Sequence, residues 1–324
     1  MENIKKNIAE LNKNWGPQIS LAVALILLLI LFSSTSPFFF TSSNLANIGL
    51  YMTILGVMAA GATVALIVGM LDVSQYTILA LVGAASITLD RAGFHIGIVL
   101  FFCLAAGAAL GAVNGFIVTV LKVHPIIGTI SSAMVMRGFT YMITASRTLS
   151  LNPETRGNYF AIGRGSLFGI PYSLIIMIFA YLVIHITLKH TQFGRYLFAV
   201  GGNSNASFLA GVNLRKIRFG ALMISGVTGG IGAFLLLSQV GSLQPNVGEA
   251  ALLNVIAAVL LGGISISGGS GKLTGTILGV IVLVVIQNGM TILGIQTFWQ
   301  MIVRGAIIII AVFINVIRGG GFKY

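Results

Sequence analysis

Ten apolar stretches run through this chain of 324 residues, and each approaches the length of a helix that crosses the hydrocarbon core of a bilayer. Only 7% of the residues are charged and 57% are hydrophobic, too little polar surface for a water-soluble particle of this size. The third and eighth stretches are short and rich in small residues. We therefore expect an all-α integral membrane protein with about ten transmembrane helices, over residues 18–36, 46–70, 74–90, 96–120, 126–145, 171–188, 217–238, 251–267, 273–294 and 299–317.

The distribution of Lys and Arg orients these helices, because basic residues accumulate in the cytoplasmic loops of membrane proteins. If the chain starts in the cytoplasm and threads alternately, its external segments hold only Arg91, Arg147, Arg156 and Arg164. Both termini are therefore expected in the cytoplasm. The cytoplasmic segments then hold twelve basic residues: Lys5, Lys6, Lys13, Lys122, Lys189, Arg195, Arg215, Lys216, Arg218, Lys272, Arg318 and Lys323.

The first apolar stretch has a second interpretation as a secretory signal. Lysines precede it and small polar residues follow at 33–36, and cleavage there would leave nine spans. We favour an uncleaved helix, because the apolar character continues into the aromatic residues 37–40.

Known catalytic and cofactor motifs do not fit the chain. The segment 268–273 resembles a phosphate-binding loop, but Ile266 and Leu273 stand where that loop needs a glycine and a Ser or Thr. The four histidines lack metal-ligand spacing, and the single cysteine, Cys103, excludes a disulfide framework. The chain is therefore expected to be no enzyme, without cofactor or metal. Its net charge of +12 is explained by cytoplasmic loops rather than by nucleic-acid binding.

Two glycine-rich segments, 69–76 and 262–271, are predicted to break or shorten helices. Gly69–Ser74 aligns with Gly262–Ser267, which hints at an internal duplication. Irregular backbone at membrane depth is tolerated only where protein buries it or a wet cavity meets it. Asp72 in the first segment either marks a pathway or a buried pair, or is hydrated at the cytoplasmic interface. Elsewhere, glycines at four-residue spacing, 107, 111 and 115, are read as helix packing.

No separate soluble domain is visible, so residues 1–324 are expected to form one transmembrane domain. Its longest hydrophilic segments are 146–170, external, and 189–216, cytoplasmic. In the second, Asn203 is a good N-cap and Gly211 a good helix stop. A short helix between them would present Phe208 and Leu209 to a partner, or would be an ordinary amphipathic surface helix.

The segment 189–216 resembles the cytoplasmic coupling loop of permease subunits of bacterial ABC importers for simple sugars, of the ribose, xylose and galactose type. Three further motifs agree, around 121–138, 248–276 and 288–289, so the resemblance covers nearly the whole chain. The family's signature after the second span has glycines where this chain has Met70 and Tyr76, which puts the break and the substrate in doubt. In the loop the matching residues are Thr191, Phe193, Gly194, Arg195, Ala199, Gly201, Gly202, Asn203, Gly211, Val212 and Asn213.

The resemblance implies a permease in the bacterial inner membrane that pairs with a second permease copy, identical or paralogous. Two cytoplasmic ATP-binding subunits would energise it and an extracytoplasmic solute-binding protein would deliver a monosaccharide such as a ribose-like pentose. Two alternatives remain: a same-family permease for a signalling furanone or a nucleoside, and an ion-driven secondary transporter. The residues expected to couple the chain to the ATPase are Phe193, Gly194, Arg195, Asn203, Phe208, Leu209 and Gly211.

A neutral, hydroxyl-rich sugar calls for uncharged polar groups along its path. The candidate path residues are Asp72, Ser74, Asn114, Glu249, Asn254, Ser265 and Asn288. The two acids are included because an ionisable group at membrane depth is costly and marks a pathway or a buried pair.

The charge distribution predicts a membrane topology that cysteine labelling can test. In intact cells, a cysteine introduced as Asn158→Cys should react with an impermeant maleimide added outside. A cysteine introduced as Asn205→Cys should react only after the cytoplasmic face is opened. Labelling of position 158 from the cytoplasmic side would refute the ten-span threading.

Overall fold

The computed structural model describes the backbone of residues 2–318 and the side chains of 18–248, 252–310 and 312–313. Among the described residues, seven helices are long and apolar enough to cross a membrane. The predicted all-α membrane fold is confirmed, and the helices at the predicted spans include short ones, as expected for the third and eighth. These helices are α1 (Glu2–Thr35), α2 (Ser42–Ile67), α3 (Gln75–Arg91), α4 (Ile96–Thr119), α5 (Pro125–Thr144), α7 (Tyr172–His190), α10 (Leu214–Val240), α11 (Glu249–Leu261), α12 (Leu273–Ile292) and α13 (Thr297–Arg318).

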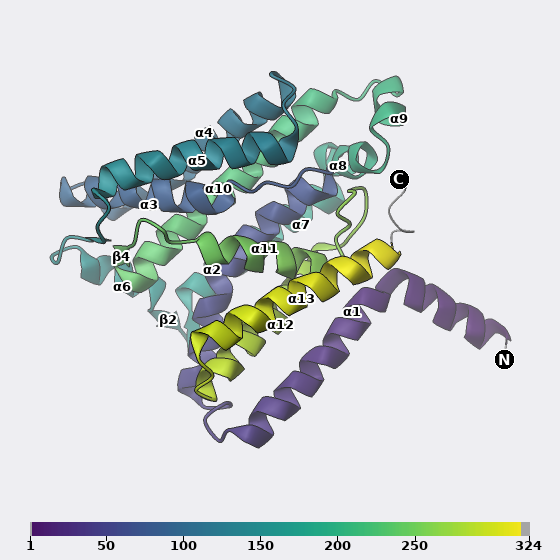
Figure 1. Ribbon diagram of the computed structural model, residues 1–324, viewed down its shortest axis with the longest axis horizontal. Coiled ribbons are helices and arrows are strands. Elements are labelled where there is room, and N and C mark those ends of the chain that lie inside the picture. The colour runs from purple at the N-terminus through teal and green to yellow at the C-terminus, as the bar shows by residue number, and fades with distance from the viewer. Residues whose placement is uncertain (1, 319–324) are drawn as a thin grey trace.

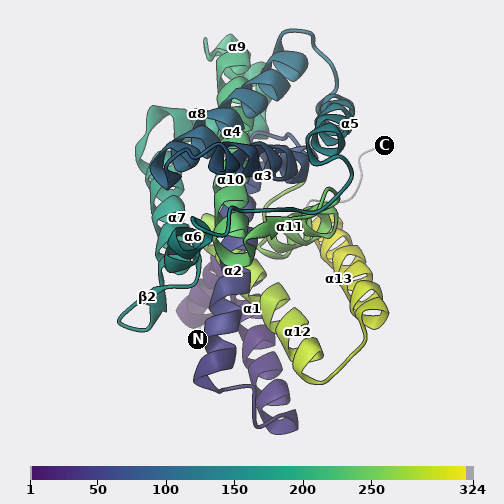
Figure 2. The same ribbon diagram turned by 90° about the vertical axis from the view of Figure 1, so that its left-hand side faces the viewer.

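Helix α2 lies in the middle of the bundle and packs against α7, α10, α11 and α12. On one side of α2, α10 packs in turn against α4 and α3. On the other side, α12 packs against α1 (Figures 1 and 2). Short elements cover the two ends. Helices α8 (Gln192–Gly202) and α9 (Ser204–Leu209) lie at one end. Helix α6 (Arg156–Gly163) lies at the other end. Two pairs of short strands accompany it: β1 (Leu149–Ser150) with β4 (Ser242–Leu243), and β2 (Ser166–Leu167) with β3 (Ile170–Pro171).

Helices α4 and α10 approach each other backbone to backbone. A Cβ on Gly107 would lie 2.5 Å from the carbonyl oxygen of Gly226, and a Cβ on Gly230 would lie 2.1 Å from that of Cys103. Lipid tails are as apolar as the helices, so close packing of small residues is what holds such a pair together. The interpretation of Gly107 and Gly111 as packing residues is confirmed, since a Cβ on Gly111 would meet the backbone of α10 as well.

The breaks after α2 and α11 are built in the same way. After α2, the amide of Gly69 donates to Leu66 (2.9 Å) and that of Met70 to Ala65 (2.9 Å), with Gly69 at φ +79°. This pair of hydrogen bonds is a Schellman motif, which satisfies carbonyls that a helix end would leave open. The carbonyls of Ala65 and Leu66 therefore find partners within the protein.

At the second break the amide of Gly263 donates to Leu260 (3.0 Å) and that of Ile264 to Val259 (3.2 Å), with Gly263 at φ +83°. The structural equivalent of Gly69 is thus Gly263, so the alignment of Gly69 with Gly262 is wrong by one residue. Sequence letters could not fix the register, because two consecutive glycines at 262–263 offer both positions while only the second takes the left-handed conformation.

The α4–α10 contact yields a stability prediction. Gly230→Ala places a methyl group against a backbone carbonyl of α4 and should destabilise the protein by about 1–3 kcal/mol, as overpacked cores do. The measurement is thermal unfolding of the detergent-solubilised protein. Gly138→Ala on α5 is the matched control, because nothing lies within 4 Å of its added Cβ. Equal melting temperatures for the two variants would contradict the packing argument.

Candidate functional site

The short helices α8 and α9 form the segment that the sequence singles out as a docking element. Thr191 caps α8 by accepting a hydrogen bond from the amide of Gly194 (3.1 Å), and Asn203 caps α9 by accepting one from Ala206 (2.9 Å). At the other end of α9 Gly211 takes φ +79°. The predicted short helix between Asn203 and Gly211 is confirmed.

Helix α9 presents two large apolar side chains to solvent. Phe208 is 67% exposed and Leu209 is 86% exposed, while Ser207 on the opposite face is buried. Two neighbouring apolar side chains held outward on a capped helix are typical of an interaction surface. An aromatic anchor that fills a partner's pocket commonly carries much of the binding energy.

Two other predicted coupling residues, Phe193 and Gly194, attach this segment to the bundle. A Cβ on Gly220 of α10 would lie 3.0 Å from the ring of Phe193, so the ring packs on α10. A Cβ on Gly194 would lie 2.3 Å from the carbonyl of Leu188, which only glycine permits. Arg195 is exposed, as is Asn203. The structure therefore separates an attached part, around 193–194, from an exposed part, around 208–209.

The end of α8 touches both helix breaks through backbone atoms. A Cβ on Gly201 would lie 1.9 Å from the carbonyl oxygen of Ile67 at the end of α2. The same carbonyl accepts a hydrogen bond of 2.8 Å from the amide of Gly269 in the 262–272 segment. Three segments far apart in the sequence thus share one point, with no flexible side chain between them. The end of α8 is therefore in backbone contact with both breaks.

Next to the first break lies a buried polar network at the start of α3. One carboxylate oxygen of Asp72 accepts hydrogen bonds from the amide (2.9 Å) and hydroxyl (2.6 Å) of Ser74, and the other accepts one from Ser225 (2.7 Å). Asn114 donates to the Ser74 hydroxyl (2.6 Å) and accepts from Ser132 (2.5 Å). The network joins the first break to α4, α5 and α10.

Asp72 is 5% exposed, so it is buried rather than hydrated at the interface. Its position before the first turn of α3 suits a negative charge, because the amide dipoles of a helix point their positive end there. A carboxylate away from water is costly unless hydrogen bonds satisfy it. The three donors found here supply that satisfaction.

The other candidate path residues lie apart from this network. Asn288 forms a reciprocal amide pair with Asn44, with hydrogen bonds of 3.0 and 2.8 Å that join α12 to α2. Asn254 and Ser265 are half-buried, in α11 and the second break. Glu249 is the first residue of α11, but its side chain lies outside the described residues. That these residues line a substrate path stays a prediction.

Sequence reasoning missed the partners in these contacts. Asn44, Ser225 and Ser132 are the hydrogen-bonding partners of candidate residues, and each lies in or near an apolar span. A polar side chain within such a span is itself a signal, since the bilayer offers it no partner. The pairs of Asn44 with Asn288 and of Ser225 with Asp72, however, span more than 150 positions and could not be deduced from spacing.

The two departures from the family signature are accommodated without strain. The positive φ of the first break falls on Gly69, and neither Met70 nor Tyr76 is among the described residues with positive φ. Met70 is buried, and Tyr76 lies in α3 with the guanidinium of Arg137 5.9 Å from its ring centre. The break therefore requires no positive φ at either position, and a change in the size of the path near them stays a prediction.

Comparisons with known proteins agree with this arrangement. Residues 44–312 match a family described as "Branched-chain amino acid transport system / permease component". The ribose import permease of Escherichia coli K12 is 33% identical over 304 residues, 94% of this chain and 95% of the relative. That of Bacillus subtilis is 33% identical over 293 residues, 90% and 91% of the two chains.

A more distant relative is the L-arabinose ABC transporter permease of Azospirillum brasilense, 29% identical over 298 residues, which are 92% of this chain and 87% of the relative. No significant match was found among solved structures. The family match covers most of the chain, and the ribose permeases exceed 30% identity over nine-tenths of it. The chain therefore belongs to this family of permease components, the non-catalytic membrane subunits of ABC importers.

Proposed function

We propose that the chain forms the transmembrane pathway of an importer for a monosaccharide, a ribose-like pentose or a related sugar. The curated relatives named for ribose and L-arabinose support this substrate class. The functional unit is a pair of permease copies in the bacterial inner membrane, identical or paralogous. Two ATP-binding subunits bind on the cytoplasmic side, where both termini lie, and a solute-binding protein delivers the sugar outside.

The single observation that carries the proposal is the construction of α8 and α9. Helix α9 offers the exposed Phe208 and Leu209 to the ATP-binding subunit, while α8 is joined through Gly201 to both helix breaks. Closure of the ATPase dimer around ATP displaces α9, and this displacement reaches the ends of α2 and α11 as a rigid-body shift. The pathway then alternates between outward-open and inward-open states without any chemistry from this chain.

Within the pathway, the half-buried Asn254 and Ser265 are the candidate contacts to sugar hydroxyls. Asp72, Ser74, Asn114 and Asn288 already hydrogen-bond to protein groups, and so they hold the helices beside the path in place. Permeases of the same family for a signalling furanone or a nucleoside remain the alternative. An ion-driven carrier is disfavoured, because the carboxylate of Asp72 is committed to three protein donors.

Phe208→Asp tests the coupling. It puts a charge where a partner's pocket must desolvate it, so affinity for the ATP-binding subunit should fall about 30-fold or more, as for other binding hot spots. We expect co-purification of that subunit and ATP-driven uptake of labelled ribose to be lost, with normal expression. Competition by unlabelled arabinose, xylose and adenosine in the wild type ranks the substrate alternatives.

Asn205→Ala is the matched control for Phe208→Asp, because Asn205 is exposed on the same helix and makes no cap. It should transport nearly normally. Full uptake and association in Phe208→Asp would place the coupling surface elsewhere, at the exposed Arg195 first.

Gly201→Ala tests the transmission step separately. The added methyl group meets the Ile67 carbonyl, whereas in Gly202→Ala the nearest atom is 4.0 Å away. Gly201→Ala should keep the ATP-binding subunit bound but lower uptake at least about tenfold, because a shifted α8 no longer seats on the breaks. Gly202→Ala should resemble the wild type. Equal uptake by the two variants, measured at matched expression, would disprove transmission through this contact.

A further inference from the structure

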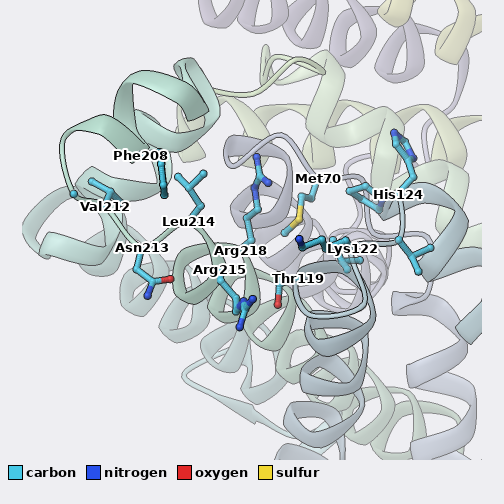
Figure 3. A pocket seen from close by; sticks show the side chains of 14 residues that line it. Met70, Thr119, Lys122, His124, Phe208, Val212, Asn213, Leu214, Arg215 and Arg218 are labelled. Carbon is cyan, nitrogen blue, oxygen red and sulfur yellow. The ribbon is translucent and has the colours of Figure 1, made fainter.

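A groove of about 810 Å³ lies beside α9, between the start of α10 and the turn that joins α4 to α5 (Figure 3). Its walls combine apolar and basic groups. The apolar part includes Met70, Val118 and Leu214, and the basic part consists of Lys122, Arg215 and Arg218, with His124 nearby. None of the described residues that line the groove is acidic. Within this described lining the cations therefore face no carboxylate.

Lys122 adopts a backbone conformation that lysine disfavours. It takes φ +58°, a left-handed conformation that glycine or asparagine adopts more readily than lysine. The chain turns here through hydrogen bonds from Leu121 and Val123 back to α4, so the backbone cannot relax at Lys122 alone. A non-glycine residue kept in such a conformation is a reason to look for a function of its side chain.

Two other features add positive potential to the groove. Figure 3 shows Lys122 and Arg218 reaching into the same space over Met70. Among the described residues, Arg218 donates a hydrogen bond to the hydroxyl of Ser204 (2.9 Å), while its buried Nε–H finds no acceptor there. Helix α5 starts at Pro125 without a side-chain cap, so its first amide groups and its dipole also favour an anion.

The surroundings identify the anion as amphipathic. On the α4–α5 side of the groove Leu121 and Ile127 are exposed large apolar residues at the ends of membrane-spanning helices. Both lie within two residues of the lining, so on the proposed topology this side of the groove meets the boundary between headgroups and hydrocarbon. A free inorganic ion would use the cations but not the apolar wall.

We propose that the groove binds the headgroup of an anionic phospholipid of the cytoplasmic leaflet, with its phosphate between Lys122, Arg215 and Arg218. Basic pockets at the cytoplasmic ends of membrane helices suit this chemistry. Phe208 forms part of the same lining, so a bound lipid lies against the coupling helix. The site goes beyond the transport proposal, because binding requires neither the ATP-binding subunit nor a sugar.

The test uses the purified chain in a neutral detergent, with dioctanoyl phosphatidylglycerol and dioctanoyl phosphatidylcholine as probes and native mass spectrometry as the readout. The wild type should prefer phosphatidylglycerol. The Lys122→Gln/Arg215→Gln variant should lose that preference, with about 30-fold weaker binding, about fivefold for each lost cation. Both positions are exposed, so neither change disturbs the core.

The matched control is Lys189→Gln/Lys216→Gln, which removes two exposed basic residues at the same end of the chain but outside the groove. It should bind phosphatidylglycerol as the wild type does. Lys122→Gly separates binding from folding, because glycine relieves the positive φ: it should unfold no earlier than the wild type and still bind about fivefold more weakly.

Three outcomes would overturn the proposal. Equal losses in the groove and control variants would show diffuse attraction instead of a site. Competition by millimolar inorganic phosphate would show a free-anion site. Loss of the ATP-binding subunit from the groove variant in pure phosphatidylcholine nanodiscs, with unchanged phosphatidylglycerol binding, would assign the groove to an acidic protein segment.

Discussion

The bilayer offers no partner to a free backbone amide or carbonyl, and this constraint governs how the two interrupted helices are built. Helices α2 and α11 are each followed by a glycine in the left-handed conformation, Gly69 and Gly263, which closes the helix end. The remaining carbonyl of Ile67 is taken by Gly269 from the other break. The two interruptions are therefore compatible with membrane burial because each contributes to satisfying the other.

The same constraint explains why so many polar side chains of the spans bond to one another. Asp72, Ser74 and Asn114 hold α3, α4 and α10 around the first break, and Asn44 with Asn288 holds α2 to α12. Hydrogen bonds between membrane helices are individually modest, but they fix which faces meet. Polar residues in a transporter thus divide into those that fix the scaffold and those left over for a solute. Burial and bonding make that division, and residue type alone does not.

The sequence was sufficient for features set by local physics. Apolar length predicted the helices, and the capping preferences of Asn203 and Gly211 predicted α9 with both its ends. It was insufficient where distant segments choose one another. The reciprocal pair of Asn44 and Asn288 joins positions 244 residues apart, and no periodicity in the sequence predicts this pairing. The repeat around Gly69 was visible but displaced by one residue, because letters do not show which glycine turns left-handed.

Helix α9 is closed at both of its ends by its own residues, Asn203 before it and Gly211 after it. Its ends are therefore set by the local sequence, while the buried Ser207 and the bond from Arg218 to Ser204 attach it to the bundle. On the proposed docking role, residues 203–211 transplanted between permeases of this family would carry partner choice with them. Under that proposal, coupling specificity and solute specificity could diverge independently, one in nine surface residues and the other in the membrane-spanning helices.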